Sequence, residues 1–230
     1  MNRSQAMPRP LRVETGSPTD LLWVTYRWMS AGLAVTGLVA WLVSQSPAAL
    51  EIVVGNRLVF YGLLFAQLLL VLAFGSVAAR ASTAATAAMF FTYAAVTGVT
   101  FSVIFLVYTS SSIATTFLVT GGAFAGLSIF GAITKRDLSG VGRFAVFALI
   151  GLIIASVVNF FLASSALMWL TTYAGIVIFA ALTAYDTQKL KALYAAGAGA
   201  NLPLLGALTL YLDFINMFLL LLRIFGRRRD

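Results

Sequence analysis

Hydrophobic residues run along this chain in stretches that are too long and too continuous for a soluble domain. The stretches without a charged residue cover 28–50, 58–79, 81–134, 144–185 and 192–212. About 20 apolar residues of α-helix cross a bilayer core, so the two longest stretches each predict two helices, divided at polar residues 108–112 and 164–165. The predicted fold class is an all-α membrane protein, a bundle of seven transmembrane helices.

The seven predicted helices lie near residues 23–43, 58–79, 87–107, 114–133, 144–163, 167–190 and 205–225. Asp213 interrupts the last one, but its length suffices for a span, so we favour a full crossing over a re-entrant segment. Prolines and arginines near the start predict a disordered cytoplasmic tail over 1–21. A single transmembrane domain over 22–226 and a basic tail over 227–230 complete the predicted organisation.

The charged residues indicate orientation. With the N-terminus inside, the predicted inner segments hold ten Lys and Arg residues, whereas the outer connections before the last helix hold one, Arg57. Short cytoplasmic loops are enriched in Lys and Arg, so we predict a cytoplasmic N-terminus. The net charge of +8 is scattered over helix ends, which argues against a nucleic-acid partner and leaves the lipid bilayer as the predicted surroundings.

The residue types that are missing from the sequence exclude several classes of chemistry. The chain contains no Cys and no His, so it has no disulfides, no thiolate metal site and no histidine base. Any sensing of pH must then use carboxyl groups. The numerous aromatic residues are explained by packing and lipid contact, and no cofactor is needed to account for them.

Two acidic residues, Asp186 and Asp213, lie in or against apolar helices. An ionised carboxylate at the centre of a span costs at least roughly 2.5–3.5 kcal/mol on insertion scales, so such an acid suggests a function. Asp213 lies eight residues past Leu205, about 12 Å along the helix. Asp186 reaches a similar depth if its helix continues to about Leu193, so consecutive antiparallel helices bring the two acids together. We expect such a pair to share one proton.

Four further residues are candidates to act with this pair. Tyr185, Thr209 and Asn216 are predicted hydrogen-bond partners, because they are adjacent to Asp186 or share the helical face of Asp213. Arg80 ends a helix at the same membrane face and is the obvious countercharge. In the alternative interpretation, Asp186 is an interfacial acid neutralised by a nearby lysine, Asp213 is a structural hydrogen-bonding group, and Arg80 is a topology anchor.

Glycines at positions 122 and 126 have the spacing that lets two helix backbones approach closely. We expect them to pack inside the bundle; the alternative is a dimerisation face.

Several motifs resemble one known family. The segments GAITKRDLSGVG (131–142), GLIIASVVN (151–159) and, above all, ALTAYDTQKLK (181–191) are similar to the bacterial branch of the Bax inhibitor-1 family. The resemblance covers about 21–226. It implies a seven-helix fold whose C-terminal helix is central, in the bacterial inner membrane.

The resemblance also implies a function. It implies a pH-sensitive calcium leak in which Asp186 and Asp213 form the pH sensor and transient calcium ligands, while Arg80 matches a latching arginine. The chain departs from the family at Gln67, since members often carry an acid in that helix. Calcium enters here as the transported ion and not as a cofactor.

Three functional hypotheses stay open. The first is the pH-gated cation leak, and the second is a membrane-embedded regulator that binds a membrane protease or another partner, as family members are also thought to do. A proton-coupled carrier is the third. Enzymes are disfavoured, because neither aspartate has the Gly-x-Gly-Asp context of intramembrane proteases and 205–225 lacks the lysine of a rhodopsin.

Overall fold

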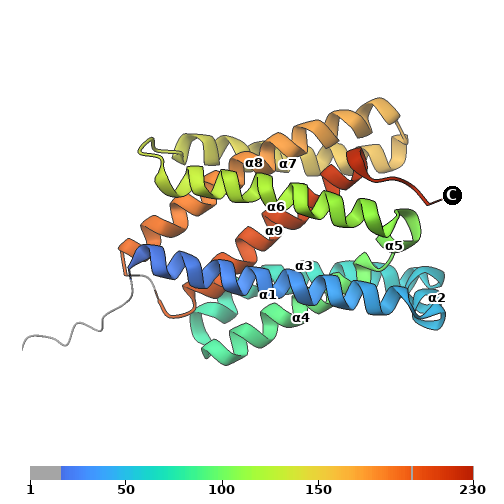
Figure 1. Cartoon of the computed structure of the whole chain (residues 1–230), viewed down its shortest axis with the longest axis horizontal. Coiled ribbons are helices and arrows are strands. Elements are labelled where there is room, and N and C mark those ends of the chain that lie inside the picture. Colours follow the sequence, from blue (N-terminus) through green and yellow to red (C-terminus); the bar gives the residue numbers. More distant parts are fainter. Residues whose placement is uncertain (1–16, 198, 230) are drawn as a thin grey trace, which may run out of the picture.

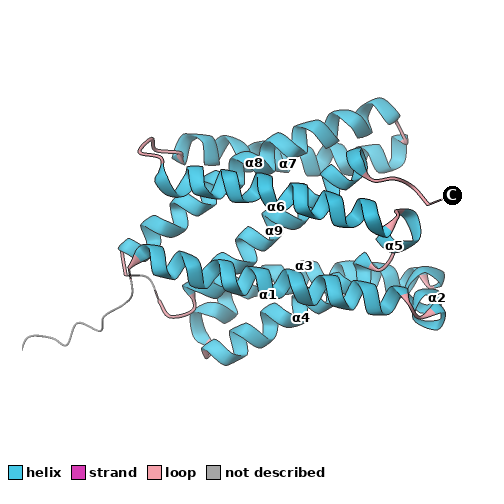
Figure 2. Cartoon of the chain, viewed as in Figure 1, coloured by secondary structure: helices cyan, strands magenta, loops and turns pink. Residues whose placement is uncertain are grey.

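A computed structural model describes residues 17–197 and 199–229, and the regular elements of this part of the chain are all α-helices. In chain order they are α1 (Pro18–Ser44), α2 (Pro47–Gly55), α3 (Arg57–Arg80), α4 (Thr83–Phe101), α5 (Ile104–Val107), α6 (Ser110–Ile133), α7 (Ser139–Leu162), α8 (Ser165–Ala195) and α9 (Leu202–Phe225) (Figure 1). Short connections join most of them (Figure 2).

Seven helical segments are long and apolar enough to cross a membrane, when α4 and α5 are counted as one segment. They correspond one by one to the seven predicted spans, so the predicted fold class is confirmed. The start of α1 and the α8–α9 connection lie at one end of the bundle, and α2 and the end of the chain lie at the other (Figure 1).

The first helix begins at Pro18 and not near residue 23. Ser17 caps it: the Ser17 hydroxyl accepts a hydrogen bond from the Asp20 backbone N–H, and the Asp20 carboxylate accepts from the Ser17 N–H. This reciprocal capping satisfies N–H groups that the first helical turn leaves without partners. Residues 17–21 of the predicted tail therefore belong to a helix terminus, while 1–16 lie outside the described residues.

Two short helices, α2 and α5, differ from the prediction. Ser46 caps α2, whose nine residues are too few to span. The predicted helix over 87–107 breaks after Phe101, where the Ser102 hydroxyl donates to the carbonyl oxygen of Val99 at 2.7 Å. Such local side-chain bonds compete with the α-helical pattern, and α5 resumes it for one turn.

The last helix, α9, is the most buried of the spans. It packs against α1, α3, α4, α6 and α8, and it runs obliquely between the α1–α4 group and the α6–α8 group (Figure 1). Its 24 residues form one unbroken helix that is long and apolar enough to cross a membrane; the full crossing stays a prediction. Beyond it, the backbone N–H of Thr109 donates to the Arg227 carbonyl oxygen at 2.9 Å, so the basic tail is tied to the α5–α6 connection.

The close helix approach occurs at a different glycine from the two predicted. Gly122 and Gly126 are exposed, and a Cβ at either would meet nothing within 4 Å. The expectation that they pack inside the bundle is therefore wrong for this chain. Gly131, on the same helix α6, is buried, and a Cβ there would overlap the carbonyl oxygen of Ala184 on α8.

Candidate functional site

Asp213 lies halfway along α9, the helix with the most buried face. Its residue is 5% exposed, and its Oδ2 atom has no hydrogen-bond partner among the described residues. A buried carboxylate oxygen without a partner is costly. Its position in the helix that contacts most of the others therefore needs an explanation in terms of protonation or of a ligand.

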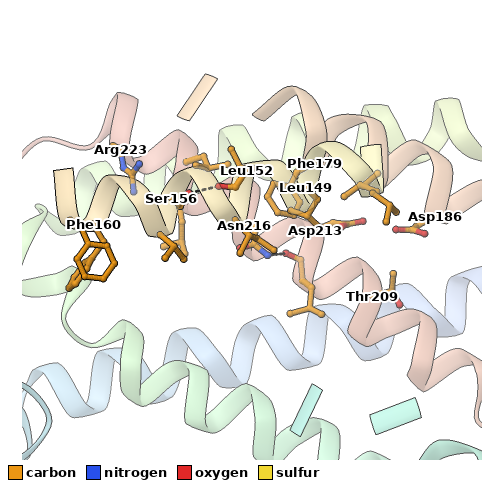
Figure 3. Close-up of a pocket in the computed structure, with 18 residues that line it drawn as sticks. Leu149, Leu152, Ser156, Phe160, Phe179, Asp186, Thr209, Asp213, Asn216 and Arg223 are labelled. Carbon is orange, nitrogen blue, oxygen red and sulfur yellow. Dashed lines mark hydrogen bonds between the residues drawn. The ribbon is translucent and has the colours of Figure 1, made fainter. Parts of the chain in front are cut away.

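Asp186 provides that explanation, because its carboxyl group lies within hydrogen-bonding reach of the Asp213 carboxyl group. Asp186 is half-buried on α8, which packs antiparallel against α9 through the connection at 196–201. Figure 3 shows the two side chains directed toward one another from the two helices. The structure thus brings together the two acids that the sequence singled out.

Two ionised carboxylates in contact repel each other, and low dielectric strengthens the repulsion. The contact is favourable when one proton lies between them, with one group donating and the other accepting. Lys189, one turn further along α8, adds a positive charge near Asp186, and its Nζ lies 5.8 Å from the centre of the Tyr185 ring. The number of protons that the pair holds therefore sets the net charge at this contact.

A cavity of about 870 Å³ adjoins the pair between α7, α8 and α9. Thr209 and Asn216 of α9 line this cavity, together with Phe179 and Leu182 of α8. Within 17–197 and 199–229, the structure contains no group of three or more His, Cys, Asp or Glu residues that could hold a metal ion.

The predicted supporting residues use their donors elsewhere. The Thr209 hydroxyl donates to the Leu205 carbonyl oxygen at 3.1 Å, and the Asn216 amide donates to that of Leu212 at 2.8 Å. Both residues face the cavity, but neither bonds to the aspartates, because helix carbonyls four residues back are nearer acceptors. Tyr185 packs over Gly142 of α7 instead.

Arg80 is also apart from the pair in this structure. It is exposed at the end of α3, a helix that packs against α4 and, less extensively, α9. In the part of the chain that the structure describes, the Arg80 guanidinium forms neither a hydrogen bond nor an ion pair with another residue. The predicted countercharge contact with Asp186 is therefore not formed here. The end of α3 is bonded instead to the residue that precedes α9, where the Asn201 amide donates to the carbonyl oxygens of Ala78 and Ala81 at 2.9 Å.

Sequence reasoning missed the far end of the cavity. There the Arg223 guanidinium donates to the hydroxyl of Thr172 at 3.0 Å, which links α9 to α8. The cavity wall that α7 contributes was missed as well. Arg223 stood out in the sequence only as a charge near a helix end, and α7 is apolar on all sides, so the pattern carried no signal for either feature.

The fold and the site define a class of protein. A bundle of seven apolar helices of spanning length, with a carboxyl pair buried between two of them, is a multi-pass integral membrane protein. Residues 20–230 match the family described as "Inhibitor of apoptosis-promoting Bax1". The chain belongs to this Bax inhibitor-1 family, and the predicted resemblance is confirmed.

Curated relatives extend over nearly the whole chain. The inner membrane protein YbhL of Escherichia coli K12 is 51% identical over 210 residues, which cover 89% of this chain and 90% of YbhL. A protein of Deinococcus radiodurans is 45% identical over 210 residues, which cover 90% of this chain and 89% of that protein. A membrane protein of Streptococcus pyogenes is 36% identical over 207 residues, which cover 88% of this chain and 90% of that protein. YbhL is an inner membrane protein by name, which agrees with the predicted location; the cytoplasmic N-terminus stays a prediction.

Proposed function

We propose that this protein is a pH-sensitive cation leak, with calcium as the transported ion and the Asp186–Asp213 pair as its gate. The observation that carries the proposal is the contact of the two carboxyl groups beside a cavity in the membrane-spanning part of the bundle. Ionisable residues at this depth face the bundle interior or a water-filled cavity and mark ion and proton pathways.

The gate follows from charge balance. While one proton is shared, the pair carries a single negative charge and holds α8 against α9. After that proton leaves, two negative charges lie in contact in a medium of low dielectric, so the helices separate or a cation enters between the carboxylates. A divalent cation replaces the proton as the compensating charge, and a two-state element of this kind is the minimum for a gate.

The chemistry suits brief occupancy by calcium. Ca²⁺ takes about six to eight oxygen ligands, and two aspartates supply at most four. The remainder would come from water and from the side-chain oxygens of Thr209 and Asn216, which face the same cavity. A site of this kind is weak, as is appropriate for passage. The latch proposed for Arg80 belongs to another arrangement, in which the end of α3 lies closer to α8.

Calcium flux into liposomes that contain the purified protein tests the proposal. The wild-type flux is expected to change between about pH 5 and about pH 8.5, across the range in which a shared carboxyl proton is lost. Asp213→Asn replaces the protonated acid by a neutral amide that can donate to Asp186 at any pH. Its flux should therefore stay, over the whole range, at the value that the wild type shows at the acidic end.

Asp186→Asn should give the same pH-independent flux, because a pair with only one aspartate cannot carry two negative charges. Glu51→Gln is the matched control, because it removes one exposed acid far from the pair and should keep the wild-type profile. Wild-type pH dependence in both aspartate variants would refute the gate. Saturable exchange with solute competition would indicate a carrier, and absence of flux at every pH would favour the regulator that binds a membrane protease.

A further inference from the structure

The cavity beside the aspartates extends into a long groove between α7 and α9, here called the α7–α9 groove. Ile153, Val157 and Phe160 form its α7 wall at helical spacing, Leu212 and Leu219 form its α9 wall, and Phe179 of α8 lies in its floor. On α9 the lining runs from Thr209 to Arg223, which corresponds to about 21 Å at 1.5 Å per residue.

The α7 wall of this groove is open to the outside of the bundle. Ile153 and Val157 are each 55% exposed and Phe160 is 74% exposed, and all three lie within a helix of membrane-spanning length. At that depth the surrounding medium is the hydrocarbon of the bilayer and not water. An apolar hollow there that opens sideways is filled best by a lipid tail, because an empty hollow forfeits dispersion contacts with its lining.

One end of the groove carries a cation suited to a phosphate. Arg223 lines the groove close to the end of α9, and its only hydrogen bond within residues 17–197 and 199–229 goes to Thr172. That bond aligns the guanidinium and leaves most of its five N–H donors available. The planar guanidinium matches the geometry of phosphate oxygens. Figure 3 shows Arg223 at the opposite end of the lining from Asp186.

We propose that the α7–α9 groove is a phospholipid site, in which an acyl chain lies along the groove and the phosphate binds Arg223. The groove length is more than half of the roughly 30 Å hydrocarbon core. The cavity at the aspartates and the groove form one hollow of about 870 Å³, which is in the size range that encloses a small organic ligand. A chain seated there reaches the cavity at Asp213 and closes its side toward the bilayer. The proposal is independent of whether the protein conducts ions.

Native mass spectrometry of the full-length protein, released from nanodiscs of phosphatidylethanolamine and phosphatidylglycerol, tests the site. The wild type should retain one phospholipid. Ser156→Trp places a large ring in the groove, since Ser156 lines it, and should lower the retained fraction at least about tenfold, which equals 1.4 kcal/mol. Ser76→Trp is the matched control: Ser76 is also exposed, its hydroxyl also bonds a carbonyl of its own helix, and it lies on α3 outside the groove.

A second variant leaves the groove packing intact. Arg223→Gln should lower retention of the anionic phosphatidylglycerol about tenfold, whereas Arg57→Gln, an exposed arginine at the start of α3, should not. Equal retention by Ser156→Trp and Ser76→Trp would overturn the proposal, and so would a wild type that carries no phospholipid. Loss of a dimer on Ser156→Trp, without any bound lipid, would assign the groove to a second copy of the chain.

Discussion

The phenol oxygen of Tyr211 on α9 lies 2.7 Å from the hydroxyl oxygen of Thr36 on α1, at a depth where both side chains are almost completely buried. The Thr36 hydroxyl also donates to the carbonyl oxygen of Ala94 on α4 at 2.9 Å. Thr36 therefore donates to Ala94 and accepts from Tyr211. These two bonds connect three helices through one threonine.

Tyr211→Phe should destabilise the protein by about 0.5–1.5 kcal/mol, the net value of a buried neutral hydrogen bond. The ring and its packing stay, so the change isolates the hydroxyl. Unfolding by SDS in mixed micelles measures the free energy. Tyr61→Phe, at a side chain that is 50% exposed, is the control and should change stability by no more than a few tenths of a kcal/mol. Equal effects of the two changes would show that the Tyr211 bond contributes nothing.

Gly131→Ala should destabilise the α6–α8 contact by about 1–3 kcal/mol, since the added methyl overlaps the backbone of Ala184 and the helices must move apart. The same substitution at Gly122, on the same helix, meets open space. There alanine should leave stability unchanged or raise it by up to about 1 kcal/mol through helix propensity. The same micelle titration distinguishes the two, and a neutral Gly131→Ala would mean that the helices are not in contact there.

The seven spans could be predicted because their cause is local: apolar length and the position of charges decide whether a segment crosses. The break at Ser102 and the short helix α2 could not be predicted. Each depends on one or two hydrogen bonds, and a hydropathy pattern gives no information about them. The glycine packing shows the same limit. Positions 122, 126 and 131 have equivalent sequence surroundings, and only the placement of Ala184 decides which of them is enclosed.

The carboxyl pair could be predicted because Asp186 and Asp213 are the only acids of the sequence that fall inside the predicted membrane-spanning segments. Their partners could not. Spacing placed Thr209 and Asn216 on the correct face of α9 but did not show that their donors are taken by their own helix. The α7 wall of the groove could not be predicted from the sequence either. A helix that is apolar on all sides shows no difference between the side that faces the groove and the side that faces lipid.

Asp137, in the α6–α7 connection, should make stability depend on pH. Hydrogen bonds from Ser139 lower the pKa of this carboxyl group, and the charge of Arg143 adds to the effect. A group whose pKa falls on folding stabilises the protein above its ordinary pKa, and this contribution is lost as the pH drops through the lowered value. Asp137→Asn should therefore slightly lower the Tm at neutral pH, and the difference should shrink as the pH falls below about 3.9, the ordinary pKa of an aspartate.

Thermal unfolding in detergent, at neutral and at acidic pH, measures the difference in Tm between wild type and Asp137→Asn. Glu51→Gln, which removes another exposed negative charge, controls for the change in net charge. A difference between wild type and Asp137→Asn that is the same at acidic and at neutral pH would show that ionisation of Asp137 plays no part.

Lys189→Gln should move the pH at which calcium flux changes to higher values. The positive charge of Lys189 acts on Asp186 from one turn away and favours the state in which both carboxyl groups are ionised. Without it, that state is reached only at lower proton concentration, and an exposed charge at this range accounts for a shift of a few tenths to about one pH unit. Lys135→Gln, in the exposed α6–α7 connection, is the control and should leave the midpoint in place. A shift of the Lys189→Gln profile to lower pH would contradict the assignment of the titrating group to the Asp186–Asp213 pair.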